Sequence, residues 1–326
     1  VVTVGNEDYA VFDATGRSHG SMVWDDFFTA QNPTAMLYDP RVLYDPVHDR
    51  FILVVLHGFT PGESVIAVCM SVSSNPLEGW YIYTFASASV LADSWFDFPT
   101  LGVSDKDFYL TGNMFDAEDR FTSAIVLQID KRTGYAGMPP NYRYWTFNDA
   151  FTILPLSWGQ DAGVSPGIYM VSTKSGGSDA FVLYDVTDDF DGSPRMIPES
   201  VSVAPYELPL DGFQKGSSIA VQTNDCRALS GFYLDGIAHF VHENKSGNGY
   251  TMIRYVRYDV SNRKVRVLDY GLDGFEYAFP SVASYGTTMQ DRSVVINFLR
   301  TGETVYPESR VITVDHDMQP VSYTHL

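Results

Sequence analysis

The feature that most restricts the fold of this chain is its succession of short apolar runs, each rich in Val, Ile, Tyr, Phe and Thr. Examples are RFILVVLHGF (50–59), SAIVLQID (123–130), SSIAVQT (217–223) and MIRYVRYDV (252–260). Gly, Pro, Asn and Asp cluster between the runs, which recur roughly every ten residues. We find no stretch of about 11 residues with the apolar spacing of an amphipathic helix. The pattern therefore predicts many antiparallel strands and almost no helix.

A longer repeat lies on top of this pattern. Three segments, 38–45, 96–103 and 278–284, each start with an aromatic or acidic residue and a proline, then continue as a short run of small residues. A polar turn and a more apolar run follow, a third run ends in Asp, and a fourth run is more polar. Proline is tolerated at the first position of a strand, where no ladder donor is needed. Four strands in a unit of roughly 50 residues is the sequence shape of a β-propeller blade.

The repeat predicts an all-β fold, a β-propeller of six four-stranded blades, with seven blades left open if flanking sequence is missing. We expect a single propeller domain over residues 1–326, in a chain that is a mature protein or a fragment of a longer one. The first blade is incomplete, with three expected strands in VVTVGN, DYAVFDA and SMVWDDFF. The expected blades are 1–29, 37–86, 97–147, 155–205, 213–270 and 278–323.

The chain is strongly acidic, with 40 acids against 21 bases and a formal net charge of −19. This charge argues against a nucleic-acid partner, because phosphate binding needs a basic surface. It fits a soluble extracellular protein that binds calcium, while solubility alone is the simpler explanation. No run approaches the ~18 uncharged apolar residues of a membrane helix, so we expect no membrane span.

Signatures of enzymes and metal sites are missing from the sequence. The seven histidines are scattered, and no nucleophile elbow, His-Glu-x-x-His, phosphate loop or dinucleotide fingerprint occurs. His239 and His242 stand three apart on an expected strand, which puts them on opposite faces. Cys69 and Cys226 permit one disulfide, but we expect buried free thiols. Asn244 lies in the one glycosylation sequon.

Several motifs resemble a group of secreted bacterial β-propeller domains that occur in large multidomain surface or exported proteins. The resemblance rests on DPRVLYD (39–45), MSVSSNPLEGWYIY (70–83), WFDFPTLGV (95–103) and YPESR (306–310), together with the opening YAVFDATG. It covers nearly the whole chain and implies the fold and secretion. Those domains mostly lack an assigned activity, so the resemblance implies no catalytic residues.

Polar residues near the starts of the innermost strands form the candidate ligand site. In a propeller these strands begin at the mouth of the channel, so a pocket there could bind a small ligand or a cation. The expected lining residues are Asp39, Arg41, Asp97, Lys215 and Arg310. A structural alternative is that the Asp residues fix turns by accepting backbone N–H groups, with Arg as their ion-pair partner. Catalysis would need two carboxylates ~5–9 Å apart.

The candidate metal site is an acidic loop with Asp188, Asp189 and Asp191 followed by Gly192. Alternating carboxylates before a glycine offer hard oxygen ligands on a tight turn, which suits Ca²⁺. The loop lacks the Glu at the twelfth position of an EF-hand and the flanking helices. A solvated acidic hairpin loop is the alternative.

The sequence favours a non-enzymatic extracellular or cell-surface module for binding, adhesion or structural assembly. Its expected partner is a protein or glycan at the cell surface, and self-association in a surface assembly or filament stays open. The alternative is a glycan-active hydrolase of the sialidase or arabinanase type, using carboxylates at the channel mouth. A sialidase would need an arginine cluster on one face, which the sequence does not place.

Overall fold

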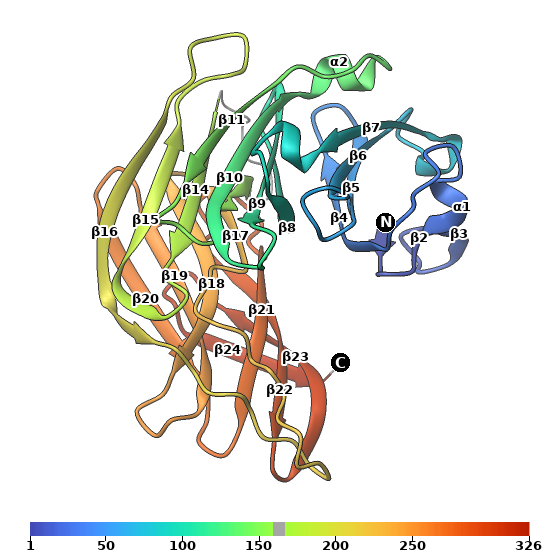
Figure 1. Cartoon of the computed structure of the whole chain (residues 1–326). Coiled ribbons are helices and arrows are strands. Elements are labelled where there is room, and N and C mark those ends of the chain that lie inside the picture. Colours follow the sequence, from blue (N-terminus) through green and yellow to red (C-terminus); the bar gives the residue numbers. More distant parts are fainter. Residues whose placement is uncertain (159–166, 326) are drawn as a thin grey trace. The chain divides into compact units, whose positions relative to one another are not determined.

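The computed structural model describes residues 1–158 and 167–325 (Figure 1). Their fold is the all-β β-propeller that the sequence predicts, built of consecutive sheets. The chain divides into two compact units. The first comprises Val1–Asp149 and Asp188–Pro194, and the second comprises Ala150–Thr187 and Arg195–Leu326.

The first unit contains three antiparallel sheets among its described residues. The first sheet has the strands β1 (Val2–Val4), β2 (Asp8–Phe12) and β3 (Ser18–Val23). The second has β4 (Leu37–Asp45), β5 (Arg50–His57), β6 (Val65–Ser71) and β7 (Trp80–Ala86). The third has β8 (Trp95–Val103), β9 (Asp107–Phe115), β10 (Phe121–Asp130) and β11 (Tyr142–Phe147). The short helices are α1 (Trp24–Phe27) and α2 (Lys131–Tyr135), with single 3₁₀ turns at Pro76–Glu78 and Ser87–Ser89.

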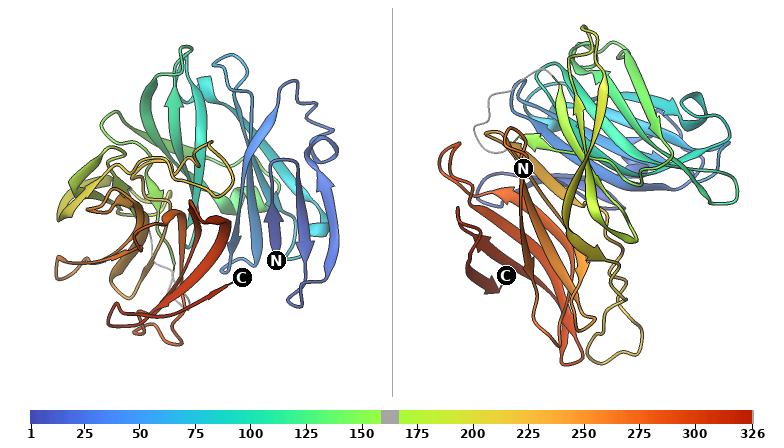
Figure 2. Two further views of the ribbon diagram at one scale, coloured as in Figure 1. Left: turned by 90° about the horizontal axis from the view of Figure 1, so that it is seen from below. Right: turned by 90° about the vertical axis from the view of Figure 1, so that its left-hand side faces the viewer.

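The second unit continues the same plan, and Figure 2 shows the strands of each sheet from two further directions. Its first sheet has β12 (Leu154–Pro155), β14 (Ile168–Thr173), β15 (Gly177–Val186) and β16 (Met196–Glu207). The next has β17 (Ser230–Leu234), β18 (Ile237–Lys245), β19 (Thr251–Asp259) and β20 (Lys264–Tyr270), and β13 (Ser157–Trp158) pairs with β17 in parallel. The last has β21 (Glu276–Ser284), β22 (Val294–Gly302), β23 (Val305–Val314) and β24 (Pro320–His325).

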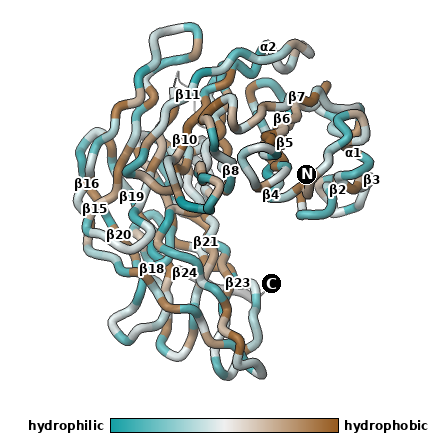
Figure 3. Tube along the Cα trace, viewed as in Figure 1, coloured by the Kyte–Doolittle hydropathy of each residue, from teal (hydrophilic) through white to brown (hydrophobic). Residues whose placement is uncertain are grey.

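Strand β5 explains how the sheets of the first unit pack. Its side chains are apolar on both faces because each face meets another sheet. Ile52, Val54 and Leu56 join a core shared with strands β9 and β10. Leu53 and Val55 alternate with them and join a second core with residues of β2 and α1. The strand is therefore sandwiched, and Figure 3 shows its hydrophobic character.

Two expected strands differ from the structure. The run SMVWDDFF was expected to be one strand, but β3 ends at Val23 and α1 begins at Trp24. The buried Trp24 indole donates to the Gly5 carbonyl oxygen at 2.9 Å, which requires the chain to turn there. The run SSIAVQT forms only an isolated bridge between Gly212 and Val221, and Ile219 is 73% exposed. An apolar run without a neighbouring strand to pair with stays irregular.

Three first strands contain the same β-bulge. The residue before each proline adopts a positive φ: 46° at Asp39, 55° at Phe98 and 53° at Phe279. In each case the first strand advances three residues while its partner advances two, so one residue is extra. A proline has no N–H to leave unpaired at the disrupted ladder. The repeated proline noted in the sequence therefore marks a bulge that bends the strand start.

Among the described residues, no helix is long and apolar enough to cross a membrane.

Gly112 on β9 lies opposite the bulge of β8, and we predict that Gly112→Ala destabilises the fold. A Cβ there would clash with the Phe96 ring and approach the Asp97 carbonyl oxygen to 2.7 Å. Overpacking of this kind costs about 1–3 kcal/mol. Urea unfolding should show the loss, whereas Gly62→Ala, with open space around the new Cβ, should leave stability unchanged. Equal effects of the two substitutions would contradict the packing argument.

Candidate functional site

Three of the predicted ligand-site residues come together in the first unit. Asp39 and Arg41 lie on β4, and Asp97 lies on β8. The Arg41 Nε donates to the Pro99 carbonyl oxygen at 3.1 Å, and its guanidinium carbon lies 5.8 Å from the centre of the Phe98 ring. Arg41 therefore reaches from one blade to the bulge of the next and holds the two strand starts together.

Tyr38 lies beside these three residues and was not among the residues predicted for the ligand site. Its hydroxyl lies 3.0 Å from the Phe96 carbonyl oxygen, to which it donates. Burial raises the pKa of the Tyr38 phenol well above its usual value, and the nearby charges of Asp97 and Asp39 raise it further. Both carboxylates are therefore close to the Tyr38 side chain.

The bulge explains why Tyr38 was missed. In the sequence, Asp39 and Asp97 resemble equivalent starts of one repeat. The strand register instead matches Asp39 with Phe98, because each directly precedes a bulge proline, and matches Asp97 with Tyr38. A shift of one residue reverses the face on which a side chain lies. The sequence does contain a signal for this offset, because Asp39 directly precedes its proline whereas Asp97 does not.

Aromatic surface borders these polar groups. Phe59 is 51% exposed, and its ring meets Tyr38 edge-on with ring centres 6.3 Å apart. Phe98 is partly exposed beneath the Arg41 guanidinium. We call the set the β4–β8 site; it consists of Tyr38, Asp39, Arg41, Phe59, Asp97 and Phe98. Ring faces can stack on the C–H face of a sugar, while carboxylates and a guanidinium bind hydroxyl groups.

Lys215 and Arg310 lie in the second unit: Arg310 is part of β23, and Lys215 contacts that strand. The Lys215 backbone N–H donates to the Val305 carbonyl oxygen at 3.2 Å, and its ammonium lies 5.1 Å from the Tyr306 ring centre. The buried Arg310 guanidinium lies 2.9 Å from the Glu308 carboxylate. A role for either residue in ligand binding stays a prediction.

The three carboxylates of the predicted metal loop have separate partners. Asp188 accepts backbone N–H groups of its own loop, from Asp189 at 2.8 Å and Ser193 at 3.1 Å. The Asp189 carboxylate lies 3.0 Å from the Lys106 ammonium. Asp191 accepts from the Arg132 guanidinium at 2.6 Å. Within residues 1–158 and 167–325, no three His, Cys, Asp or Glu side chains form a metal-like group.

The same loop is anchored to the third sheet by a buried network around Asp107. The Phe190 N–H donates to Asp107 Oδ2 at 2.8 Å, and Gln128 Nε2 donates to that oxygen at 2.7 Å. Burial raises the pKa of Asp107 to about 6. In the described part of the molecule, Asp107 Oδ1, Asp189 Oδ1 and Gln128 Oε1 are buried without a hydrogen-bond partner.

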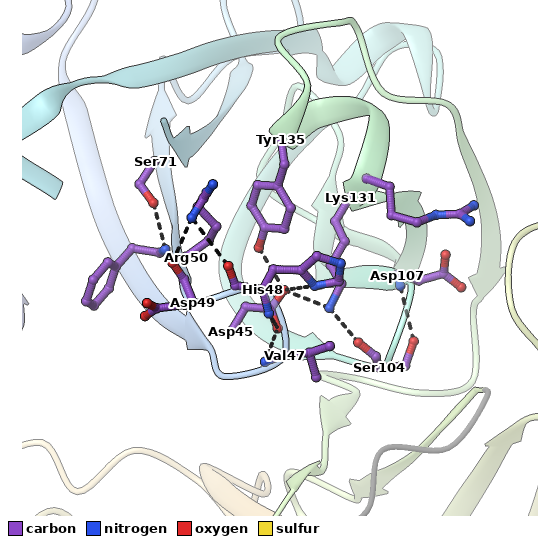
Figure 4. Close-up of polar contacts among 12 residues, drawn as sticks. Asp45, Val47, His48, Asp49, Arg50, Ser71, Ser104, Asp107, Lys131 and Tyr135 are labelled. Carbon is purple, nitrogen blue, oxygen red and sulfur yellow. Dashed lines mark hydrogen bonds and ion pairs between the residues drawn. The ribbon is translucent and has the colours of Figure 1, made fainter. Parts of the chain in front are cut away.

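A second buried network closes the other end of β4 (Figure 4). The Asp45 carboxylate accepts from the Lys131 ammonium at 2.8 Å and from the Tyr135 hydroxyl at 2.9 Å. The Lys131 ammonium also donates to the Ser104 carbonyl oxygen at 2.6 Å. Asp45 and Lys131 are both fully buried, and burial lowers the pKa of Lys131. These mutually paired groups hold hairpins together, which is a structural role.

Glu243 on β18 is the most perturbed acid of the second unit. It is fully buried, and its Oε1 accepts the N–H of the bulge residue Phe279 at 2.7 Å. Its Oε2 is buried and has no partner among the described residues. Burial raises the pKa of Glu243 to about 8, and burial lowers the pKa of the neighbouring His242 to about 4. Both side chains are therefore mostly uncharged at neutral pH.

The cysteine and histidine expectations are confirmed. Cys69 and Cys226 are buried free thiols. His239 Nδ1 pairs with the Tyr255 hydroxyl at 2.7 Å, while His242 Nδ1 donates to the Glu243 carbonyl oxygen at 2.7 Å. The two histidines thus have separate surroundings.

Comparisons with known proteins support the fold only. No protein-family model matches the chain, and no curated protein sequence matches it. Among solved structures, it is similar to an apocarotenoid oxygenase mutant from Synechocystis, with 10% identity, a TM-score of 0.52, and coverage of 100% of this chain and 74% of that one. It is also similar to an α-L-arabinanase from Cellvibrio cellulosa complexed with arabinohexaose, with 13% identity and a TM-score of 0.40. The match covers 87% of this chain and 94% of the arabinanase.

A third similar structure is prolyl oligopeptidase B from Galerina marginata bound to a 35mer hydrolysis and macrocyclization substrate. It shares 12% identity at a TM-score of 0.45, covering 88% of this chain. The chain spans only 35% of the length of that enzyme. Likeness at these identities reflects the fold and transfers no activity.

We predict that Glu243 makes the protein less stable as pH rises above neutral. Unfolded, Glu243 has its ordinary pKa of 4.5, so between that pH and about 8 the folded state holds a proton that the unfolded state releases. His242 acts in the opposite direction, but only between about pH 4 and its ordinary 6.5. From pH 6.5 to 8, the Glu243 contribution to the unfolding free energy should fall by about 2 kcal/mol.

The measurement is urea unfolding at several pH values in wild type and Glu243→Gln. The variant should lose the decline between pH 6.5 and 8, because it has no proton to release. Glu303→Gln, at an exposed position, is the matched control and should keep the wild-type slope. An unchanged slope in Glu243→Gln would show that Glu243 is ionised in the folded protein.

Proposed function

We propose that this chain is a non-enzymatic extracellular binding module that recognises a glycan at a cell surface through the β4–β8 site. The observation that carries the proposal is the meeting of Asp39, Asp97 and Arg41 beside the exposed Phe59 ring. Sugar recognition needs both an apolar face and directional polar groups. The secretion implied by the sequence resemblance supports an extracellular place of action.

The distribution of acids supports binding over hydrolysis. Glycoside hydrolysis requires a carboxylic acid of raised pKa beside a second carboxylate at the substrate. Among the described residues, burial raises the pKa of Asp107, Asp185 and Glu243. Asp107 and Glu243 are fully buried and accept backbone N–H groups. None of the three acids belongs to the β4–β8 site. Asp107 and Glu243 therefore serve the packing of their sheets.

The binding proposal predicts which substitutions weaken glycan affinity. A glycan array should identify a ligand, and calorimetry should then give its affinity for each variant. Arg41→Met, Asp97→Asn and Phe59→Ala should each weaken binding about tenfold, as expected for one lost charged hydrogen bond or stacking contact. Asp119→Asn, at an exposed turn of the same unit, should bind like wild type.

Two results would overturn this proposal. One is the absence of any glycan ligand on the array. The other is glycan turnover that disappears in Asp97→Asn, which would establish the hydrolase alternative. A parallel hydrolase screen of the wild type, run with and without a calcium chelator, separates the two readings.

We also propose that Ca²⁺ binds near the loop Asp188–Pro194, at the oxygens of Asp107, Asp189 and Gln128 that have no partner among the described residues. Calcium prefers carboxylate and amide oxygens of this kind. A bound ion stabilises the folded state, so calcium should raise the melting temperature of the wild type relative to chelator. The rise should vanish in Asp107→Asn and persist in Asp191→Asn, whose carboxylate pairs with Arg132. No calcium-dependent shift in the wild type would reject the site.

A further inference from the structure

The second unit contains a cavity of about 130 Å³ that is lined mainly by basic side chains. The described residues that line it are Ile237, Arg257, Asp259, Lys264, Arg266 and Arg292. The chain as a whole has 40 acids and only 21 Lys and Arg residues. The lining of this cavity, with four basic side chains and one acid, is therefore positively charged, whereas the chain as a whole is negatively charged.

Arg257 lies at the buried side of this cavity. Its side chain is only 3% exposed. Its guanidinium donates to the carbonyl oxygens of Asp315 at 2.8 Å, His316 at 2.5 Å and Arg292 at 2.5 Å, and to the Tyr255 hydroxyl at 2.8 Å. All these acceptors are neutral. A buried cation without an opposite charge is costly, so an anion near it would be stabilised.

The one acid of the cavity offsets part of this positive charge. Asp259 stands opposite Lys264 in the strand register. Its carboxylate accepts from Ser261 at 2.8 Å and from the Asn262 N–H at 2.9 Å. The hydrogen bonds from Asn262, together with the nearby charge of Arg292, lower the pKa of Asp259. The side chains of Lys264 and Arg292 have no hydrogen bond or ion pair within the part of the chain that the structure describes. With one acid against four bases in the lining, the cavity keeps an excess of positive charge that an anionic ligand could neutralise.

The strand register adds an independent observation. Arg257 on β19 stands directly opposite Arg266 on β20. Like charges directly opposite each other on a sheet destabilise the pairing. Asp259, two residues further along β19, supplies one negative charge beside this pair, and a bound anion would supply a second.

We propose that this cavity binds the phosphate or sulfate group of a small ester. Arginine forks match the paired oxygens of a tetrahedral oxyanion, and lysine supplies a further point charge. A cavity of about 130 Å³ has room for a group of this size. The site lies in the second unit and does not depend on glycan binding by the β4–β8 site.

Calorimetry at low ionic strength tests the proposal with inorganic phosphate, inorganic sulfate and the phosphate and sulfate esters of one monosaccharide. Arg292→Gln and Lys264→Gln should each weaken binding at least fivefold. The matched control is Arg263→Gln in the same hairpin, a side chain that is 72% exposed and pairs with Glu199 at 2.9 Å. It removes the same charge outside the cavity and should leave the affinity unchanged.

Each outcome of this experiment either supports or overturns the oxyanion site. Binding of any of the four probes that depends on Arg292 and Lys264 supports the oxyanion site, and the preferred probe identifies phosphate or sulfate as its target. Absence of binding by all four probes overturns it. Equal weakening by Arg263→Gln also overturns it, because the effect would then come from net charge. Circular dichroism of each variant confirms that the fold is retained.

Discussion

Burial of both faces of the middle strands is the constraint on which the rest of this structure depends. A strand such as β5 can bury both faces only if neighbouring sheets stack on each side, so its side chains are apolar throughout. Polar side chains are then confined to strand ends, bulges and hairpins, or must be paired inside. The β4–β8 site lies at strand starts, and the Asp45–Lys131 pair lies at hairpins. The chemistry of the molecule follows from where the packing permits polar groups.

The bulges turn this constraint into specific contacts. A bulge interrupts the ladder, so nearby backbone groups need side-chain partners. At β8, Arg41 donates to the carbonyl oxygen of the bulge proline, Pro99. At β21, the N–H of Phe279 donates to Glu243. The same local defect therefore supports an exposed polar surface in one blade and a buried, mostly protonated acid in another, because the residues around it differ.

Much of the fold was predictable from the sequence, because strand runs and repeated prolines are local signals. The β4–β8 site was predictable in part: the sequence indicated Asp39, Arg41 and Asp97, but not Tyr38, Phe59 and Phe98. Tyr38 requires the register of the bulge, which a one-residue misalignment hides. The cavity around Arg257 had no sequence signal, since its bases come from a cross-strand pair and a distant loop. Long-range register is not encoded in any short motif.

Glu243 also affects how the charge of this protein should be counted. The formal value of −19 treats every acid as ionised. With a pKa of about 8, Glu243 keeps its proton at neutral pH in the folded state and releases it on unfolding. Native and denatured molecules therefore differ in electrophoretic charge as well as in shape. Isoelectric focusing in urea measures the charge of the unfolded chain, whereas native focusing measures the charge of the folded chain. A charge calculated from composition describes only the unfolded chain.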